Sequence, residues 1–252
     1  MERRSGEGVA TVYVPEPFVT GREITLGEEA AHHLRVRRLN AGDQLAIVDG
    51  IGGRGMGRLV RLGKKDALVQ AYDGWQEPPP SAVHVLAPIA DKDRMLWLAE
   101  KVTELGAASW RPVLWKRSRS VSPRGEGMTF QGKVRARMIS ALEQSGGAWL
   151  PALFPDATVE TAIAASPPGT KLLLDPEGDS ILTPGIVGQG PVSIALGPEG
   201  GVDPAEREQL VAAGFRQVSV AGNILRFETA GIAALAIVQA SLRLTLSGPA
   251  NG

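Results

Sequence analysis

The chain has 252 residues, a formal net charge of zero and no cysteine. Without cysteine there are no disulfides or thiolate metal sites, and three histidines leave little for a histidine-based metal centre, so we expect no metal. We see no secretory signal and no apolar stretch that could span a membrane, which predicts a soluble, cytoplasmic protein with no membrane partner.

The first part of the chain has the pattern of a small β-rich domain. After a polar start, we expect short strands at residues 11–14, 44–48, 57–62 and 67–71, separated by turns rich in Gly, Asn and Asp. Residues 27–39 have helical spacing, with one apolar edge and a basic end. These elements predict a small β-barrel with one helix over residues 1–75.

The basic end of that helix is the first candidate for a binding surface. Its members are His32, His33, Arg35, Arg37 and Arg38. Such residues can contact RNA, but they can equally be the exposed face of a short helix, and the residues alone leave both interpretations open.

A proline-rich linker at residues 76–81 marks the predicted domain boundary, because three consecutive prolines continue neither a helix nor a sheet. We assign residues 82–246 to a second domain and residues 247–252 to a loose tail. The second domain begins with an expected strand at residues 83–87. A helix at residues 92–105 and a strand at residues 110–115 are expected to follow.

Charge concentrates in the middle of the chain. Residues 91–137 carry eleven Lys and Arg against five Asp and Glu, whereas residues 138–252 carry five against eleven. A basic face can therefore exist on a neutral molecule. Our best candidate for a phosphate-binding loop follows the strand at 110–115, with a plain solvated loop as the alternative. It contains Lys116, Arg117, Ser118 and Arg119.

The remaining elements alternate between strands and helices, which predicts a mostly parallel α/β sheet. We expect strands at residues 171–174, 193–196 and 217–220. The expected helices are at residues 131–145, 203–213 and 228–246. The loops after these three strands, 175–178, 197–201 and 221–226, should meet at one edge of the sheet, where α/β proteins bind ligands.

The glycines of the loop 197–201, GPEGG, let main chain approach a ligand closely. No Gly-Lys-Ser or Gly-Lys-Thr follows them, and their spacing does not fit the dinucleotide fingerprint. Taken alone, the loop could be only a tight turn. The second loop, before the ETA segment at residues 228–230, makes a ligand pocket the better interpretation.

LGPEGG, followed later by GNILRFETA, resembles the C-terminal signature of the SPOUT methyltransferases, most closely the RsmE family. AHHLRVRRLNAGD, DKDRM, EKVTELGA, EQSG and LLLDPEG match the same family in the same order. That family methylates N3 of one uridine in bacterial 16S ribosomal RNA, using S-adenosylmethionine. Phe227 departs from the pattern, since the family usually has Thr there.

The resemblance implies a PUA-like RNA-binding barrel, a C-terminal trefoil knot, a homodimer, and 16S rRNA or the small ribosomal subunit as partner. Arg226 is our choice to stabilise charge on the base, with Glu199 or Glu228 as proton acceptor. The residues expected to bind S-adenosylmethionine are Leu174, Asp175, Leu196, Gly197, Pro198, Gly200, Gly201, Val220, Gly222, Asn223, Ile224, Leu225 and Thr229.

Two other functions stay open. A SPOUT enzyme can act on another RNA atom, such as a ribose 2′-hydroxyl. The chain could also be a noncatalytic RNA-binding or ribosome-assembly protein with a decayed pocket, for which Phe227 is a hint.

Overall fold

The computed structural model describes residues 9–118 and 127–246. Internal contacts divide the chain into two units. The first comprises the chain up to Pro79 together with Ile139–Leu150, and the second comprises Pro80–Met138 and the chain from Pro151 onward.

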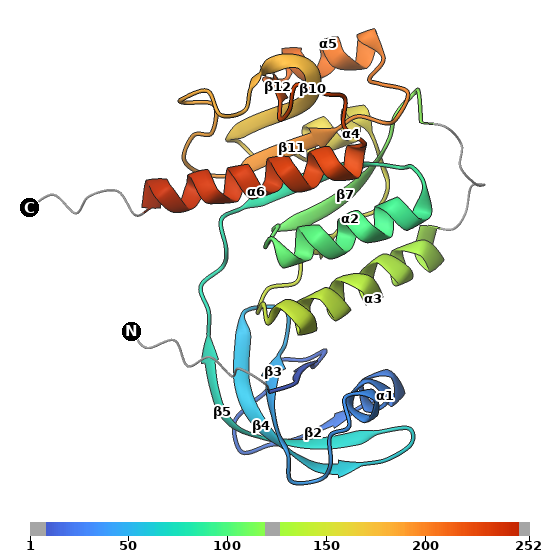
Figure 1. Cartoon of the computed structure of the whole chain (residues 1–252), viewed down its shortest axis with the longest axis vertical. Helices are drawn as coiled ribbons and strands as arrows, with labels where there is room; N and C mark the ends of the chain where they lie inside the picture. The colour runs from blue at the N-terminus through green and yellow to red at the C-terminus, as the bar shows by residue number, and fades with distance from the viewer. Residues whose placement is uncertain (1–8, 119–126, 247–252) are drawn as a thin grey trace, which may run out of the picture. The chain divides into compact units, whose positions relative to one another are not determined.

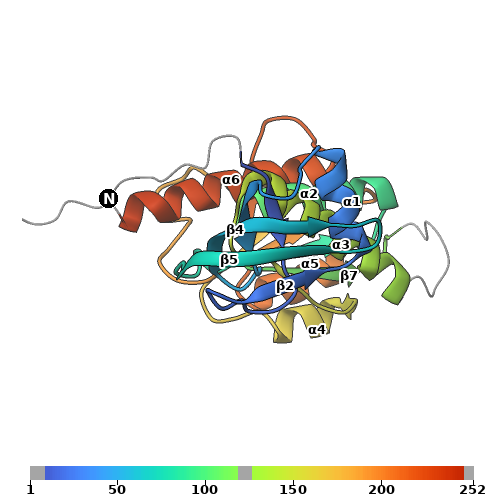
Figure 2. The ribbon, with the colours of Figure 1, turned by 90° about the horizontal axis from the view of Figure 1, so that it is seen from below.

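The first unit is a five-stranded sheet with one helix, α1 (Glu28–Val36). Its strands are β1 (Thr11–Tyr13), β2 (Glu23–Leu26), β3 (Gln44–Val48), β4 (Gly53–Leu62) and β5 (Ala67–Gln76). Their order is β1-β3-β4-β5-β2, and all neighbours are antiparallel except β1 and β3. Figure 2 shows the long strands β4 and β5 side by side. Ala31 and Leu34 of α1 pack into the apolar core of this sheet.

The expected strands at 11–14 and 44–48 correspond to β1 and β3, whereas those at 57–62 and 67–71 were too short, and β2 was missed. The turn ends earlier than expected because Asp49 Oδ1 accepts the backbone N–H groups of Ile51 and Gly53, both at 2.8 Å, so β4 starts at Gly53. Gly55 then pairs closely with β5, since a Cβ at that position would lie 2.3 Å from the Asp73 carbonyl oxygen. Glycine inside a strand was read as a turn signal, whereas here it permits close pairing.

Asp49 and Glu143 are both buried carboxylates of this unit, and Glu143 has the shifted pKa. Glu143 is 8% exposed, and its Oε1 accepts the backbone N–H of Tyr13 at 2.9 Å. Its Oε2 lies 3.7 Å from His33 Nε2. Burial raises the pKa of Glu143, and the Tyr13 hydrogen bond, His33 and Arg37 oppose that shift more weakly, while Glu29 adds to it.

We therefore expect Glu143→Gln to gain stability relative to the wild type as pH rises. A carboxyl group whose folded pKa is raised favours folding below its unfolded pKa of about 4.3, and this contribution is lost as pH rises towards the raised value. The change is at most about 1.4 kcal/mol per pH unit. Urea unfolding of both proteins between pH 4 and 5.5 measures it. Glu23→Gln, on the exposed β2 position, is the control, and parallel stability curves for Glu143→Gln and wild type would contradict the expectation.

The second unit is built on a parallel sheet. Its strands are β6 (Val83–Pro88), β7 (Ser109–Leu114), β8 (Ala152–Leu153), β9 (Ala157–Thr158), β10 (Thr170–Ser180), β11 (Val192–Leu196) and β12 (Arg216–Ser219). The order is β12-β10-β11-β6-β7-β8, with β9 also pairing with β7, and every pair is parallel. The predicted mostly parallel sheet is confirmed.

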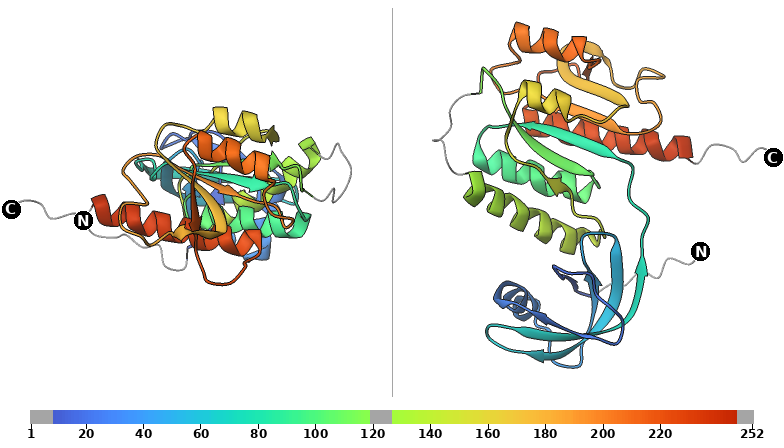
Figure 3. Two further views of the ribbon diagram at one scale, coloured as in Figure 1. Left: turned by 90° about the horizontal axis from the view of Figure 1, so that it is seen from above. Right: turned by 180° about the vertical axis from the view of Figure 1, so that it is seen from behind.

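Helices cover both faces of this sheet (Figures 1 and 3). On one face lie α2 (Lys92–Glu104) and α6 (Phe227–Leu246), which pack against each other, and α6 also packs on β11 and β6. On the other lie α4 (Val159–Ala164) and α5 (Pro204–Ala212), whose core includes Leu173, Ala195 and Phe215. Asp203 and Glu206 form the expected capping box of α5.

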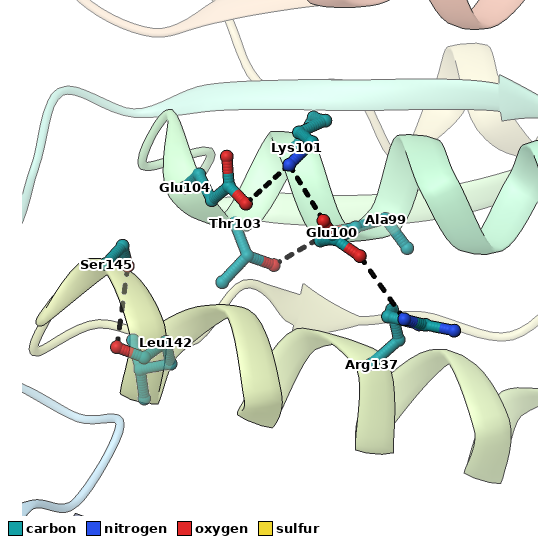
Figure 4. A network of polar contacts seen from close by, with 8 residues as sticks. All are labelled: Ala99, Glu100, Lys101, Thr103, Glu104, Arg137, Leu142 and Ser145. Carbon is teal, nitrogen blue, oxygen red and sulfur yellow. Dashed lines mark hydrogen bonds and ion pairs between the residues drawn. The ribbon is translucent and has the colours of Figure 1, made fainter. Parts of the chain in front are cut away.

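The helix α3 (Gly127–Ser145) begins in the second unit. Figure 4 shows how it is joined to α2: Glu100 accepts from Arg137 at 3.4 Å and from Lys101 at 2.7 Å, and Lys101 also bonds Glu104. These are half-exposed surface pairs, which contribute little individually to stability.

Residues 175–178, expected to be a loop, lie inside β10 as an irregular stretch. The register against β12 shifts between Leu174 and Asp179. Asp175 Oδ1 accepts the backbone N–H of Glu177 at 3.0 Å, which folds the chain locally. Gly178 then passes so close to β12 that a Cβ would lie 2.5 Å from the Gln217 carbonyl carbon. Pro176 and Gly178 therefore form a bulge within β10 and do not end the strand.

The expectation that no stretch is long enough to span a membrane is wrong on length and composition. Within the described residues, Phe227–Leu244 of α6 has 18 residues and a mean hydropathy of 1.3. The helix packs on α2 and the sheet, and Ala234, Leu235 and Val238 are fully buried. The buried core helix of a soluble protein can have the same length and hydropathy. The α6 helix packs closely on β11 at Gly231, because a Cβ there would lie 2.8 Å from Leu196 Cδ1.

Candidate functional site

A cavity of about 500 Å³ lies beside the irregular stretch of β10 and at the carboxyl ends of β11 and β12. Residues from three stretches of the chain line it: 174–176 within β10, 196–199 with 201 and 202 at the end of β11 and beyond it, and 218–221 with 223–227 at the end of β12 and beyond it. Arg94 of α2, Arg207 of α5 and Ala230 of α6 complete the wall. The structure thus brings together the three segments that the sequence placed after separate strands, at the edge where parallel sheets bind ligands.

The glycines after β11 are needed for the shape of this wall. Gly201 has a φ of +74° and donates its N–H to the Pro198 carbonyl oxygen at 2.8 Å, which closes the turn. A Cβ at Gly197 would lie only 2.7 Å from Val202 Cγ2, so a side chain there would force a shift, and a Cβ at Gly200 would lie tightly at 3.1 Å from the Arg117 carbonyl oxygen. The loop therefore presents main chain to the cavity.

An ion pair between a buried carboxylate and a partly exposed arginine holds the cavity wall at β10. Asp175 is 5% exposed, and its Oδ2 lies 2.9 Å from Arg207 Nη1. Arg207 also bonds the side-chain oxygen of Gln217 at 3.3 Å. Both Asp175 oxygens are thus engaged, one by Arg207 and one by the Glu177 N–H, so this carboxylate shapes the wall.

A second charged cluster connects α2, the glycine loop and α6. Arg94 Nη1 donates to Glu199 Oε1, and Arg94 Nε lies 3.8 Å from Glu228 Oε1. The Glu199 side chain is 42% exposed, whereas that of Glu228 is 6% exposed. Only Glu199 of the two carboxylates borders the cavity.

The segment before α6 supplies one cation and apolar surface. Arg226 is exposed and lines the cavity together with Ile224 and Leu225. Phe227, which replaces the threonine usual in the RsmE family, is 5% exposed and also borders the cavity. The Phe227 ring therefore adds apolar surface to the cavity wall, whereas a threonine at this position would add a hydroxyl group.

Most residues predicted to bind the methyl donor lie around this one cavity, although their contact with a ligand stays a prediction. Those lining it are Leu174, Asp175, Leu196, Gly197, Pro198, Gly201, Val220, Asn223, Ile224 and Leu225, together with the predicted catalytic residues Arg226 and Glu199. Gly200, Gly222, Thr229 and Glu228 were also predicted and do not line it.

The predicted RNA-binding residues occupy two places. In the first unit, His32 and Arg37 are exposed, His33 faces Glu143, Arg35 donates to the Gly63 carbonyl oxygen at 2.5 Å, and Arg38 has a φ of +60°. These contacts place the basic residues at the end of α1, and their RNA contacts stay a prediction.

In the second unit, the basic turn after β7 is attached to the start of α5. Lys116 Nζ and Arg117 Nε lie 3.2 and 3.7 Å from Asp203 Oδ2. Ser118 accepts the Trp115 N–H at 3.2 Å. Arg119 lies outside the described residues.

Sequence reasoning missed two arginines of the wall, Arg94 and Arg207. Arg94 lies in the DKDRM motif, which we noted as a match without giving it a role. Arg207 lies four residues after the cap of α5, and its partner Asp175 could not be inferred from spacing. In residues 9–118 and 127–246 no group of three His, Asp or Glu side chains could hold a metal ion.

Comparison with known families decides the class of protein. The sequence pattern of the RNA methyltransferase domain matches residues 77–239, and that of the RNA methyltransferase PUA domain matches residues 26–72. The chain belongs to this RNA methyltransferase family. The expected enzyme class and the PUA-like first domain are thereby confirmed.

Relatives within this RNA methyltransferase family carry the name ribosomal RNA small subunit methyltransferase E. The protein of Mycobacterium bovis is 27% identical over 223 residues, which cover 84% of each chain. That of Synechocystis is 29% identical over 238 residues, covering 92% of this chain and 77% of the relative. The resemblance to the RsmE family is confirmed.

Solved structures of RNA methyltransferases agree in fold. The ribosomal RNA small subunit methyltransferase E of Neisseria gonorrhoeae, bound to S-adenosyl methionine, has a TM-score of 0.84 and 27% identity over 92% of this chain and 98% of that one. A methyltransferase of Legionella pneumophila, in complex with the cofactor SAM, has a TM-score of 0.86 and 26% identity over the same shares.

Proposed function

We propose that this RNA methyltransferase transfers the methyl group of S-adenosylmethionine to N3 of a uridine in 16S ribosomal RNA. The observation that carries the proposal is the cavity beside three adjacent strands, β10, β11 and β12, bordered by Arg226 and Glu199. Its relatives named for small subunit rRNA methylation support the substrate.

The cavity fits S-adenosylmethionine in size and chemistry. About 500 Å³ lies within the range of small-molecule sites. Leu196, Ile224 and Leu225 would flank the adenine, and the main chain of the glycine loop would offer N–H and C=O groups to its edge. When bound, the donor supplies an electrophilic methyl group on a positively charged sulfur.

The uridine nitrogen must become a nucleophile at this wall. N3 of uridine carries a proton at neutral pH, so a proton acceptor and a stabiliser of negative charge are both required. Arg226 would stabilise the charge that develops on the flanking carbonyl oxygens. Glu199 would accept the N3 proton, because it borders the cavity and is 42% exposed, whereas Glu228 is buried behind the wall.

The RNA would present an unpaired or flipped uridine, since N3 is hidden in paired RNA. Arg37, Lys116 and Arg117 are exposed cations, and His32 is an exposed imidazole, all suited to phosphate contact. RNA affinity should therefore fall steeply with salt, with log K decreasing roughly linearly with log salt. Filter binding of 16S rRNA fragments from 50 to 300 mM KCl measures this, and a flat profile would contradict phosphate contact.

We also propose a homodimer, the trefoil knot and action in the cytoplasm, as the RsmE resemblance implies. The outer face of α6 suits self-association, because Ala236, Ala240 and Leu244 are exposed on it. Sedimentation equilibrium tests the dimer. Convergence of segments 174–176, 196–202 and 218–227 at one cavity is what a threaded C-terminal segment would produce.

Nucleoside analysis of ribosomal RNA tests the activity. Cells lacking the protein should lack N3-methyluridine in 16S rRNA, and restoring the gene should restore it. Loss of a ribose-methylated nucleoside instead would support the alternative acceptor atom. Calorimetry with S-adenosylmethionine separates the noncatalytic alternative, because a decayed pocket would show no binding.

A further inference from the structure

Arg94 occupies an unfavourable place for a cation. It lies in the first turn of α2, where its N–H donates to the N-cap Asp91 at 3.1 Å. The N-terminus of a helix is partly positive, so a guanidinium there is disfavoured unless anions lie close by. Glu199 and Glu228 are those anions. The ion pairs of the Arg94 guanidinium therefore compensate for its unfavourable position at the helix N-terminus.

Glu228 needs such a cation more than Glu199 does. Its side chain is 6% exposed, and among the described residues Oε2 has no hydrogen-bond partner. A buried carboxylate is unfavourable unless positive charge compensates it, and Arg94 Nε lies 3.8 Å from Oε1. Glu228 lies in the first turn of α6, two residues after Arg226.

We propose that Arg94 is a positioning residue for methyl transfer, which fastens Glu199 of the glycine loop to Glu228 at the start of α6. One planar guanidinium thereby sets the placement of the proton acceptor relative to the segment that carries Arg226. The inference rests on the proposed function and adds to it a residue that acts through Glu199. The other charged groups that border the cavity are Arg226 and the pair Asp175 and Arg207.

Arg94→Gln should lower kcat by about 10²-fold, the lower end of the contribution of a positioned general base. It should also move the acid limb of the kcat pH profile to higher pH, because an adjacent cation favours the ionised carboxylate. A merely structural arginine would lower kcat without moving that limb. Arg94→Lys should return the acid limb of the kcat pH profile to its wild-type position but recover only part of kcat. The ammonium group is a point charge and cannot hold two carboxylates as the planar guanidinium does.

A double-mutant cycle tests whether the effect of Arg94 passes through Glu199. If Arg94 acts through Glu199, the double variant Arg94→Gln and Glu199→Gln should be no slower than Glu199→Gln alone. Arg137→Gln is the matched control, since Arg137 also pairs with a glutamate, Glu100, away from the cavity (Figure 4). It should leave kcat unchanged.

Two results would overturn the positioning role in an enzyme whose wild type is active. One is an acid limb of the kcat pH profile that stays at the same pH in Arg94→Gln, and the other is a double variant whose kcat is lower than that of Glu199→Gln by the full factor lost in Arg94→Gln. Absence of methylation by the wild type, measured with tritiated donor on 16S rRNA fragments, would overturn the proposed function and this inference with it.

Discussion

Arg226→Ala should lower kcat for RNA methylation by about 10²-fold to 10³-fold, the cost of removing one group that stabilises charge in a transition state. Arg226 borders the cavity and is exposed, so its truncation leaves no void in the core. The affinity for S-adenosylmethionine should change little, because the proposed partner of the guanidinium is the base. Single-turnover methylation and calorimetry on the same preparation measure the two quantities.

Arg216→Ala is the control for this prediction. Arg216 is an exposed arginine of the same unit, paired with Asp179 at 2.7 Å and outside the cavity wall. Its removal should leave both quantities unchanged. If Arg226→Ala instead weakens donor binding as much as turnover, Arg226 binds the donor and has no separate role in the chemistry.

Gly201→Ala should lower the affinity for S-adenosylmethionine by about tenfold. Gly201 has a φ of +74°, a conformation that costs an L-residue roughly 1–2 kcal/mol. The loop can relieve that strain by moving, which would displace the main chain that lines the cavity. No atom lies within 4 Å of the added Cβ, so backbone conformation alone causes the effect. Calorimetric titration with the donor measures it.

Gly214→Ala is closely matched to this change. Gly214 has a φ of +88° and open space around its Cβ, but it follows α5 away from the cavity wall. Both variants should lose about 1 kcal/mol of unfolding free energy, and only Gly201→Ala should lose donor affinity. Equal donor affinity in the two variants would remove the glycine loop from the proposed binding site.

Local pattern was enough to predict the parallel sheet and the cavity at its edge. Alternating strands and helices place the loops at 197–201 and 221–226 on the same edge, because parallel strands share a direction. The capping box of α5 was visible from Asp203 and Glu206, which lie three positions apart. Such features depend on neighbours in the sequence.

What could not be predicted depends on residues far apart in the chain. Arg94 and Glu199 are separated by 105 positions, and Tyr13 and Glu143 by 130. No periodicity encodes such pairs, since they form only after the sheet has assembled. The extension of β10 beyond Leu174 was hidden for a related reason: Pro176 and Gly178 are turn residues, and only the pairing with β12 shows that they form a bulge.

The cavity wall is formed largely by residues without an ionisable side chain, and its charged members include Arg207, which is paired with Asp175, and Arg94, which is paired with Glu199. Peptide groups neither gain nor lose protons between pH 5 and 9. Under the proposed function, the wall that meets the donor therefore adds few titrating groups of its own, whereas the subsequent alkylation would depend on one carboxylate, Glu199. Acidity would then act on such an enzyme through the chemical step more than through the wall of its donor site.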